Sequence, residues 1–284
     1  MSSKVVYAQG GLGNQLFQYA FLKFVQYKFK CVGFDMGRVV YDAQHSGVDI
    51  RLLLNPSCKV LESNNKKLSW LVRDDLLCRM CRLFLRKLSV NKIGNYIYDY
   101  DANIKSSKID IDECDIFVGY FQSVDYAIYS KSIIEMEISE KHSDKLKKYS
   151  DLYSQYTAIH IRRGDFCTSK NKKHPTFSVQ DISSVLSGRY SRVVFFSDDI
   201  NWCRNNFGHM DGLIFHSGGN AIDDFLAMTQ CKNYILFGST FSWWAAFLFS
   251  DKQTKVDAIY GCDALFFNSD SLNKLGWKIH SPHH

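Results

Sequence analysis

The sequence is poor in proline and lacks a disulfide framework, and both features exclude classes of protein. Only three prolines occur in 284 residues, while 46% of the residues are hydrophobic and 15% are aromatic. That composition is typical of a compact globular chain and not of a disordered or linker-rich one. The nine cysteines follow no disulfide-like spacing, so we expect reduced thiols. The lone Cys78-x-x-Cys81 has no second pair and is more typical of core packing than of a zinc or redox site.

Signals for export, membrane crossing and glycosylation are missing as well. The first residues enter a strand-like run without the apolar core of a signal peptide. The longest apolar runs, such as 243–249, are far shorter than the about 18 residues that indicate a spanning helix. The only Asn-x-Ser sequence, at Asn55, contains proline and is not a glycosylation acceptor. We therefore expect a cytoplasmic protein, of bacterial origin.

The charge of the chain favours anionic partners of moderate size. A formal net charge of +6 suits a nucleotide sugar, a pyrophosphate-linked lipid or a membrane surface. It is too small to indicate nucleic acid by itself, and no nucleic-acid-binding module is recognised. We expect no nucleic-acid partner.

Short apolar runs separated by helix-length spacers predict an α/β protein with parallel sheets covered on both faces. They indicate two Rossmann-like lobes with a cleft between them, one formed by residues 1–150 and the other by residues 151–284. The first unit opens with a strand at Val5–Ala8, a turn and a helix at Asn14–Phe29. The other expected strands are Cys31–Asp35, Asp115–Tyr120, Thr157–Ile161, Arg192–Phe196, Leu213–His216, Asn233–Gly238 and Val256–Tyr260.

The stretch Leu68–Val90 differs from the rest of the chain because it predicts a basic amphipathic helix. Three arginines share one side of the helical wheel and four apolar residues share another. Such a helix could rest peripherally on an anionic membrane, although we favour a core-packed helix with a solvated face. The side chains concerned are Arg79, Arg82 and Arg86, and Leu77, Met80, Phe84 and Leu88.

The first expected strand is followed by a glycine-rich turn, Gly10–Gln15, with the sequence GGLGNQ. Glycines allow a ligand to approach the backbone, and the helix that follows offers free N–H groups to an anion. The turn is not the dinucleotide fingerprint, because Leu16 stands where the third glycine would be. The alternative interpretation is a tight turn capped by Asn14.

A second motif, His160–Asp165, has the sequence HIRRGD and ends the strand at Thr157–Ile161. Because side chains alternate along a strand, His160 and Arg162 are expected on the same side. An arginine there can hold a diphosphate and stabilise the charge on a nucleotide leaving group. The alternative is a surface ion pair between an arginine and Asp165.

A third strand end carries Ser197, Asp198 and Asp199. A carboxylate accepts two parallel hydrogen bonds, which suits the N1–H and amino edge of guanine. A metal site would lack a third ligand at useful spacing, whereas a helix N-cap by either aspartate explains the same residues. The spacing leaves this choice open.

The fourth motif follows the strand Asn233–Gly238 and carries Ser239, Thr240 and Ser242. Hydroxyl groups at a strand-to-helix junction can donate to phosphate oxygens beside the positive helix end. The tryptophans that follow, Trp243 and Trp244, are more typical of a core than of a sugar-stacking platform.

With these four motifs in this order, the chain resembles the α-1,2-fucosyltransferase family. Gly10–Gln15 is similar to the amino-terminal motif of that family, and His160–Asp165 is similar to its His-x-Arg-Arg-Gly-Asp motif. The matches span residues 9–246. Residues 40–114 match no motif that we can name, and Phe166 stands where an aromatic residue, often tyrosine, is usual.

The resemblance implies a GT-B-type fold, GDP-fucose as donor, inversion at the anomeric carbon and no required metal. It implies that Arg162 grips the β-phosphate, His160 lies against the nucleoside and Asp198 recognises guanine, while Thr240 and Ser242 bind the diphosphate. The predicted donor-binding residues are Gly11, Asn14, His160, Arg162, Asp198, Ser239, Thr240 and Ser242.

The predicted catalytic residues are Arg162, which stabilises the leaving group, and Asp165 as the base that removes the acceptor proton. Asp35 is a rival for the base, and a reaction without a carboxylate base is a third possibility. The expected acceptor is the 2-hydroxyl of a galactose in an oligosaccharide or lipid-linked glycan, such as a surface polysaccharide unit. The alternatives are a fucosyltransferase of another linkage and a catalytically silent protein that binds a nucleotide sugar or glycan.

Overall fold

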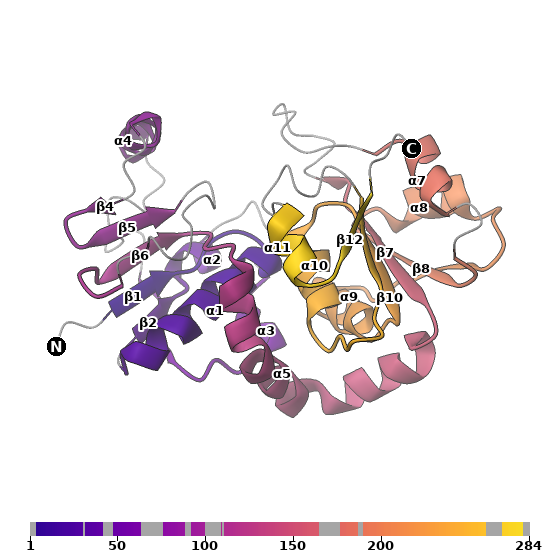
Figure 1. The fold of residues 1–284 in the computed structure, drawn as a ribbon, viewed down its shortest axis with the longest axis horizontal. Coiled ribbons are helices and arrows are strands. Elements are labelled where there is room, and N and C mark those ends of the chain that lie inside the picture. Colours follow the sequence, from indigo (N-terminus) through magenta and orange to yellow (C-terminus); the bar gives the residue numbers. More distant parts are fainter. Residues whose placement is uncertain are drawn as a thin grey trace. The chain divides into compact units, whose positions relative to one another are not determined.

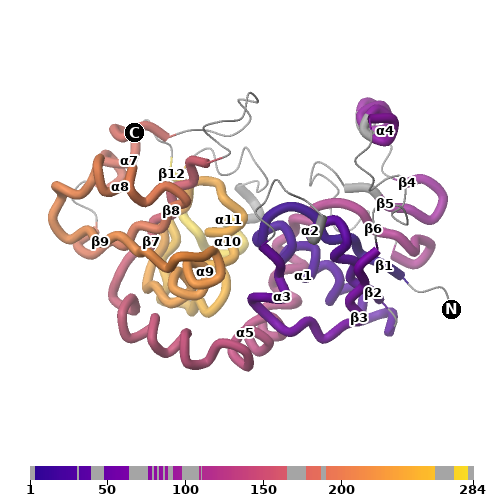
Figure 2. Tube along the Cα trace, turned by 180° about the vertical axis from the view of Figure 1, so that it is seen from behind, coloured from indigo at the N-terminus to yellow at the C-terminus, as the bar shows by residue number. Residues whose placement is uncertain are grey.

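The computed structural model describes residues 4–30, 32–41, 48–63, 76–88, 92–99, 109, 111–164, 177–186, 190–259 and 269–280. The chain divides into two compact units, Met1–Lys141 (unit 1) and His142–His284 (unit 2). Figures 1 and 2 show the elements of each unit. Helix α5 (Val124–Tyr153) runs through the division, and its non-helical residue, His142, is the first residue of unit 2.

Unit 1 is built on a six-stranded sheet of order β3-β2-β1-β6-β5-β4. The neighbouring strands are parallel, except that β4 and β5 form an antiparallel pair. Strands β1 and β6 are parallel neighbours at the centre of the sheet, so the turns that follow these two strands leave the sheet side by side. The strands are β1 (Lys4–Tyr7), β2 (Val32–Asp35), β3 (Lys59–Leu61), β4 (Lys92–Ile93), β5 (Tyr96–Asp99) and β6 (Ile116–Gly119).

The central helix of unit 1 is α1, which is buried along most of its length. Its side chains from Gln15 to Lys23 are all buried, as its apolar residues on several faces predict. The helix begins at Leu12, two residues before the expected start, because Gly11 and not Asn14 is its N-cap. The helices of this unit before α5 are α1 (Leu12–Lys28), α2 (Gly37–Tyr41), α3 (Ile50–Leu53) and α4 (Leu76–Lys87).

Unit 2 is a doubly wound α/β unit with a parallel sheet. Its order, β12-β11-β10-β7-β8-β9, is the 3-2-1-4-5-6 order of a Rossmann sheet when the strands are counted within the unit. The strands are β7 (Thr157–Ile161), β8 (Val193–Ser197), β9 (Leu213–Phe215), β10 (Asn233–Leu236), β11 (Val256–Ile259) and β12 (Lys278–His280). The helices are α7 (Val179–Leu186), α8 (Ile200–Phe207), α9 (Ala221–Thr229), α10 (Thr240–Phe247) and α11 (Ser269–Lys274).

Two parallel-sheet units of this kind confirm the α/β fold of GT-B type that the sequence predicts. The eight strands expected from the sequence all form, within about two residues at each end. The four strands that sequence patterning missed are β3, β4, β5 and β12, which have two to four residues each. Such short segments show too little periodicity to be recognised.

Helix α4 corrects one prediction. Core packing was the favoured interpretation of its apolar side, but Leu77, Met80, Phe84 and Leu88 are 73%, 60%, 63% and 57% exposed. The side that packs inward carries Cys78, which is buried, and Leu85, which contacts the cluster around Tyr7 and Val118. The arginine side chains of this helix lie outside the described residues. No helix in the described part of the chain is both long enough and apolar enough to cross a bilayer.

The loop after β2 leaves no room for a side chain at Gly37. A Cβ atom there would lie 2.1 Å from the carbonyl oxygen of Ser63 and 2.9 Å from its carbonyl carbon. Both atoms belong to the backbone, so a rotamer change cannot relieve the contact. At Gly11, by contrast, a Cβ atom would meet nothing within 4 Å, and the backbone φ of −70° is ordinary for any residue.

We therefore expect Gly37→Ala to lower the free energy of unfolding by about 1–3 kcal/mol, because the methyl group forces the backbone to shift. Urea unfolding followed by circular dichroism measures this change. Gly11→Ala is the matched control and should unfold within about 0.5 kcal/mol of the wild type. Equal stability of the two variants would show that Ser63 moves aside without strain.

Candidate active site

The reversal of strand order in unit 2 lies between β7 and β10, which pair directly. Ligands of open α/β sheets bind beyond the carboxyl ends of the strands at this switch point. The residues that follow β7 are Arg162, Arg163 and Gly164, and those that follow β10 lead to Ser239 and Thr240. The second and fourth sequence motifs therefore flank the position at which this fold binds ligands.

Asp198 holds the loop that carries Arg162. Its Oδ1 accepts a hydrogen bond from the backbone N–H of Arg163 at 2.8 Å, and its Oδ2 accepts one from the N–H of Gly164 at 3.2 Å. The Ser197 hydroxyl donates to the Ile161 carbonyl oxygen at 2.7 Å and fixes the same strand end. Each carboxylate oxygen keeps lone-pair capacity, so recognition of guanine by Asp198 stays a prediction beside this positioning role.

The two arginines of the motif have different surroundings. The guanidinium of Arg163 lies over the Trp202 ring at 3.8 Å from the ring centre, and its Nε is 3.3 Å from Oδ2 of Asp199. Asp199 is also the N-cap of α8 and accepts from the N–H of Trp202. Arg162, which is half-buried, lies close enough to His160 for its charge to lower the pKa of that residue. This agrees with the alternation expected along β7.

His160 is a neutral, buried side chain at the switch point. It is 8% exposed, its ring lies 5.3 Å from the Phe241 ring, and its Nδ1 has no hydrogen-bond partner within the described residues. Burial, and next the charge of Arg162, lower the pKa of His160 to about 3, against an opposing effect of Asp224. The imidazole is therefore uncharged near neutral pH and cannot donate a proton as an acid there.

The start of α10 is a helix N-terminus without a side-chain cap. Ser239 is the N-cap residue but makes no capping hydrogen bond, whereas Asp199 caps α8 and Asn220 caps α9. The first-turn N–H groups of α10 are therefore available to an anion. Thr240 is partly exposed beside them.

Other side chains of the fourth motif are buried within the protein. Ser242 is fully buried, and its hydroxyl donates to the Ser239 carbonyl oxygen at 3.1 Å. Its predicted contact with a diphosphate would require this bond to be exchanged. Trp243 and Trp244 are 3% and 0% exposed, which confirms that both belong to the core.

In unit 1 the glycine-rich turn follows β1, whose parallel neighbour at the centre of the sheet is β6. Gly10 has a φ of +75°, and Gly11 precedes α1 without any side-chain cap. Asn14 does not cap the turn, because its Oδ1 accepts a hydrogen bond from Gln122 Nε2 at 3.0 Å. Gln122 follows β6, so this bond joins the segments that follow the two neighbouring strands.

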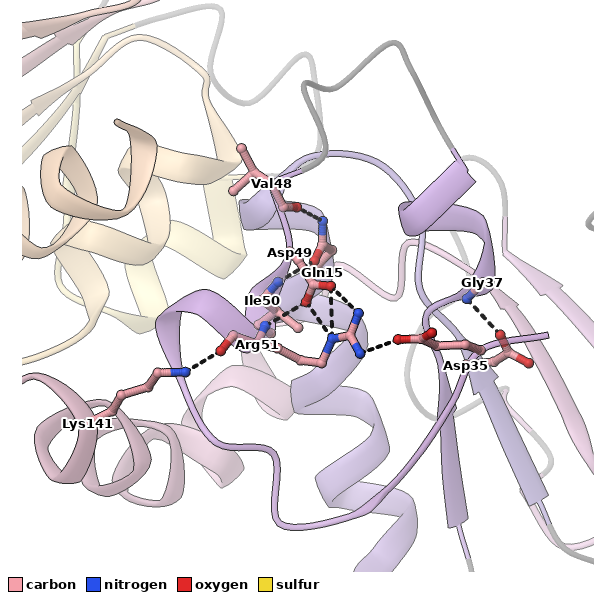
Figure 3. Close-up of polar contacts among 9 residues, drawn as sticks. Gln15, Asp35, Gly37, Val48, Asp49, Ile50, Arg51 and Lys141 are labelled. Carbon is pink, nitrogen blue, oxygen red and sulfur yellow. Dashed lines mark hydrogen bonds and ion pairs between the residues drawn. The ribbon is translucent and has the colours of Figure 1, made fainter. Parts of the chain in front are cut away.

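Two buried glutamines, to which sequence analysis gave no role, hold this turn. Gln15 donates to the carbonyl oxygen of Gly10 at 2.8 Å. It also donates to the carbonyl oxygen of Val48 at 2.8 Å and accepts from the N–H of Ile50 at 2.9 Å (Figure 3). Gln18 accepts from the N–H of Gln9 at 2.9 Å and donates to the Gly119 carbonyl oxygen at 2.8 Å. The sequence signal that could have revealed them is the presence of two polar residues, three positions apart, within an otherwise apolar helix.

The rival base, Asp35, serves the structure of unit 1. Its side chain is buried, at 1% exposure, and accepts hydrogen bonds from the N–H of Gly37 at 2.9 Å and from the Ser63 hydroxyl at 2.5 Å. Burial, and next the charge of Asp35, raise the pKa of Tyr7 to about 12. The hydrogen bonds from Gly37 and Ser63 give Asp35 the role of fixing the loops after β2 and β3.

Two predictions concerning chemistry stay open. Asp165 lies outside the described residues, so its role as the base stays a prediction. Across the residues that the structure describes, no three His, Cys, Asp or Glu side chains gather as metal ligands would.

The buried state of His160 predicts a pH dependence of stability. Because its pKa falls from 6.5 in the unfolded chain to about 3 in the folded protein, the unfolded chain takes up the proton first as the pH decreases. The stability linked to this residue is complete above about pH 6.5 and is lost toward pH 3, by about 1.4 kcal/mol per pH unit.

We expect His160→Phe, which keeps a flat ring against Phe241, to lose this dependence, so that its unfolding free energy falls less steeply than that of the wild type from about pH 6.5 to pH 5. Urea unfolding at several pH values measures the difference in slope. His209→Phe, at an exposed position, controls for the loss of a histidine. Parallel slopes for wild type and His160→Phe would contradict the assignment.

Comparison with known proteins identifies the family. A model of glycosyl transferase family 11 matches residues 4–280. The O-antigen biosynthesis glycosyltransferase WbnK of Escherichia coli is 27% identical, over 94% of this chain and 95% of the relative. An alpha-1,2-colitosyltransferase of Escherichia coli is 28% identical, over 87% and 88%. A galactoside 2-alpha-L-fucosyltransferase of Bos taurus is 32% identical over 34% of this chain and 29% of its own length.

Among solved structures, the NodZ alpha-1,6-fucosyltransferase soaked with GDP-fucose has a similar fold. The match has a TM-score of 0.52 at 14% identity, and it covers 87% of this chain and 92% of that one. Because the family model covers nearly the whole chain and two bacterial relatives align along most of their lengths, the chain belongs to glycosyl transferase family 11, which confirms its resemblance to the α-1,2-fucosyltransferases.

Proposed function

We propose that this protein transfers L-fucose from GDP-fucose to the 2-hydroxyl of a galactose in an acceptor glycan, with inversion at the anomeric carbon. The observation that carries the proposal is that Arg162 and the uncapped N-terminus of α10 follow the two neighbouring strands, β7 and β10, at the switch point of unit 2. Membership of glycosyl transferase family 11 gives this geometry its reaction class.

The donor would bind in unit 2 through its diphosphate. Arg162 offers a forked guanidinium, and the first turn of α10 offers backbone N–H groups together with the positive end of the helix dipole. Both stabilise negative charge, which increases on the β-phosphate as its bond to the sugar breaks. Because these groups provide positive charge themselves, we expect turnover without an added metal.

The reaction would proceed as a single displacement. The bond from the anomeric carbon to the β-phosphate oxygen breaks and GDP leaves, while the acceptor oxygen attacks the opposite face of an oxocarbenium-like sugar. The hydroxyl proton leaves with a base, for which Asp165 is our candidate. His160, as a neutral ring, would contribute contact with the nucleoside.

The relatives support the linkage and leave two candidate sugars. The bovine relative is named as a galactoside 2-alpha-L-fucosyltransferase, and the colitosyl relative also forms an alpha-1,2 bond. Colitose lacks the 3-hydroxyl of fucose, so GDP-colitose is a second candidate donor. WbnK, named for O-antigen biosynthesis, favours a surface polysaccharide unit as the acceptor.

Incubation with GDP-fucose and lactose in the presence of EDTA tests the proposal directly. GDP release together with an α-1,2-linked product would support donor, linkage and metal independence at once, and GDP-colitose in parallel would rank the two donors. A product of another linkage would move the protein to a different acceptor class. Binding of GDP-fucose without product across a panel of galactosides would favour a silent binding protein.

Arg162→Lys keeps the charge but removes the forked geometry, so turnover should fall by about a hundredfold or more. Steady-state kinetics of GDP release measures the change. Arg163→Lys is the matched control: its side chain faces Trp202 and Asp199, so it should retain most of the activity. Near-normal turnover of Arg162→Lys would remove Arg162 from the mechanism.

In the wild type the Asp198 carboxylate accepts hydrogen bonds from two loop N–H groups, and Asp198→Asn places an amide NH₂ against one of them. We expect turnover to fall about tenfold to a hundredfold, because the loop that carries Arg162 loses its position. Calorimetric affinities for GDP and IDP, which lacks the 2-amino group, test the guanine role. That role predicts that the preference for GDP falls too; an unchanged preference would leave Asp198 with positioning alone.

A further inference from the structure

Helix α4 carries an exposed apolar face that the proposed reaction does not use. Of the twelve large apolar side chains exposed among the described residues, six lie within 76–88, and the other six are spread over α1, α3 and α5. Figures 1 and 2 show α4 apart from the labelled helices α1, α2 and α3 of its unit. The six are Leu76, Leu77, Met80, Leu83, Phe84 and Leu88, with exposures from 57% to 75%.

The helix is also strongly basic. Residues 76–87, which form the helix, contain three arginines and one lysine but no aspartate or glutamate. Lys87 is exposed on the helix itself. An apolar face on a basic helix is the pattern of a segment that lies in the interface of an anionic membrane.

The attachment of α4 to unit 1 leaves this face outward. Cys78 is buried and Leu85 packs against the cluster of Tyr7 and Val118. These two residues are seven positions apart and therefore lie on one side of the helix. Met80 and Phe84, four positions apart, lie on another side and remain exposed.

We propose that α4 docks the protein on an anionic lipid bilayer, with Leu77, Met80 and Phe84 inserted among the lipid chains and the basic residues at the headgroups. A second copy of the chain fits this face less well, because a two-fold interface would bring the same basic helix of both copies together. A negative headgroup surface neutralises that charge instead. The proposal does not depend on the sugar donor, the acceptor or the linkage.

Co-sedimentation of the purified protein with vesicles tests this docking. One set of vesicles is phosphatidylcholine alone, and the other is equal parts phosphatidylcholine and phosphatidylglycerol. We expect at least about tenfold tighter binding to the anionic set. The double variant Met80→Glu/Phe84→Glu should lose at least about tenfold of that affinity, and Arg79→Gln/Arg86→Gln about fivefold for each charge removed.

The matched control is Ile128→Glu/Met136→Glu, which changes two exposed apolar residues of α5, 46% and 53% exposed, and should bind vesicles like the wild type. No binding, or equal binding to both vesicle sets, would overturn the proposal. So would an equal loss in the control. Light scattering completes the test: a wild-type dimer that Met80→Glu/Phe84→Glu dissociates without changing vesicle binding would assign the face to a second copy. Sedimentation needs no turnover, so its outcome is independent of the proposed activity.

Discussion

The strand order of the two parallel sheets is the constraint on which the candidate site depends. In unit 2 the order reverses between β7 and β10, whereas in unit 1 the strands β1 and β6 are parallel neighbours at the centre of the sheet. The connections on either side of a reversal run in opposite directions and leave the strand ends uncovered. The segments that carry Arg162 and Thr240 follow β7 and β10, and a hydrogen bond joins Asn14 and Gln122 beside β1 and β6, although each pair is far apart in sequence.

Buried polar side chains turn these strand ends into defined loops. Gln15 and Gln18 satisfy backbone groups after β1, at the end of β6 and at the start of α3, and Asp198 does so for the loop after β7. Backbone groups in such turns have no ladder partner, so leaving them unpaired within the protein would be destabilising. The same hydrogen bonds that stabilise the fold therefore fix the positions of the groups that would contact a ligand.

Neighbouring residues of one motif acquire different functions from their surroundings. The guanidinium of Arg163 stacks on Trp202 and pairs with Asp199, whereas Arg162 lies beside a histidine that burial keeps neutral. Asp199 caps α8 while Asp198 holds a loop. A similar division separates helix N-termini: α8 and α9 have side-chain caps, and α1 and α10 have none. An uncapped terminus at a switch point is suited to an anionic ligand.

The sequence by itself determined the fold class, the central strands of both sheets and the four motifs, because short apolar runs, glycine turns and clustered polar residues are local signals. Only the tertiary structure decided which residue of a motif does what. Ser242 and Asp35 have the residue types of ligand-binding groups, yet the surrounding structure buries both, and Asp35 accepts a hydrogen bond from Ser63, 28 residues further along the chain. The outward face of α4 was likewise undecidable from its pattern, since an amphipathic helix looks the same whether a core or another surface covers it. Burial and hydrogen-bond partners arise from residues distant in sequence, which is why local patterning cannot supply them.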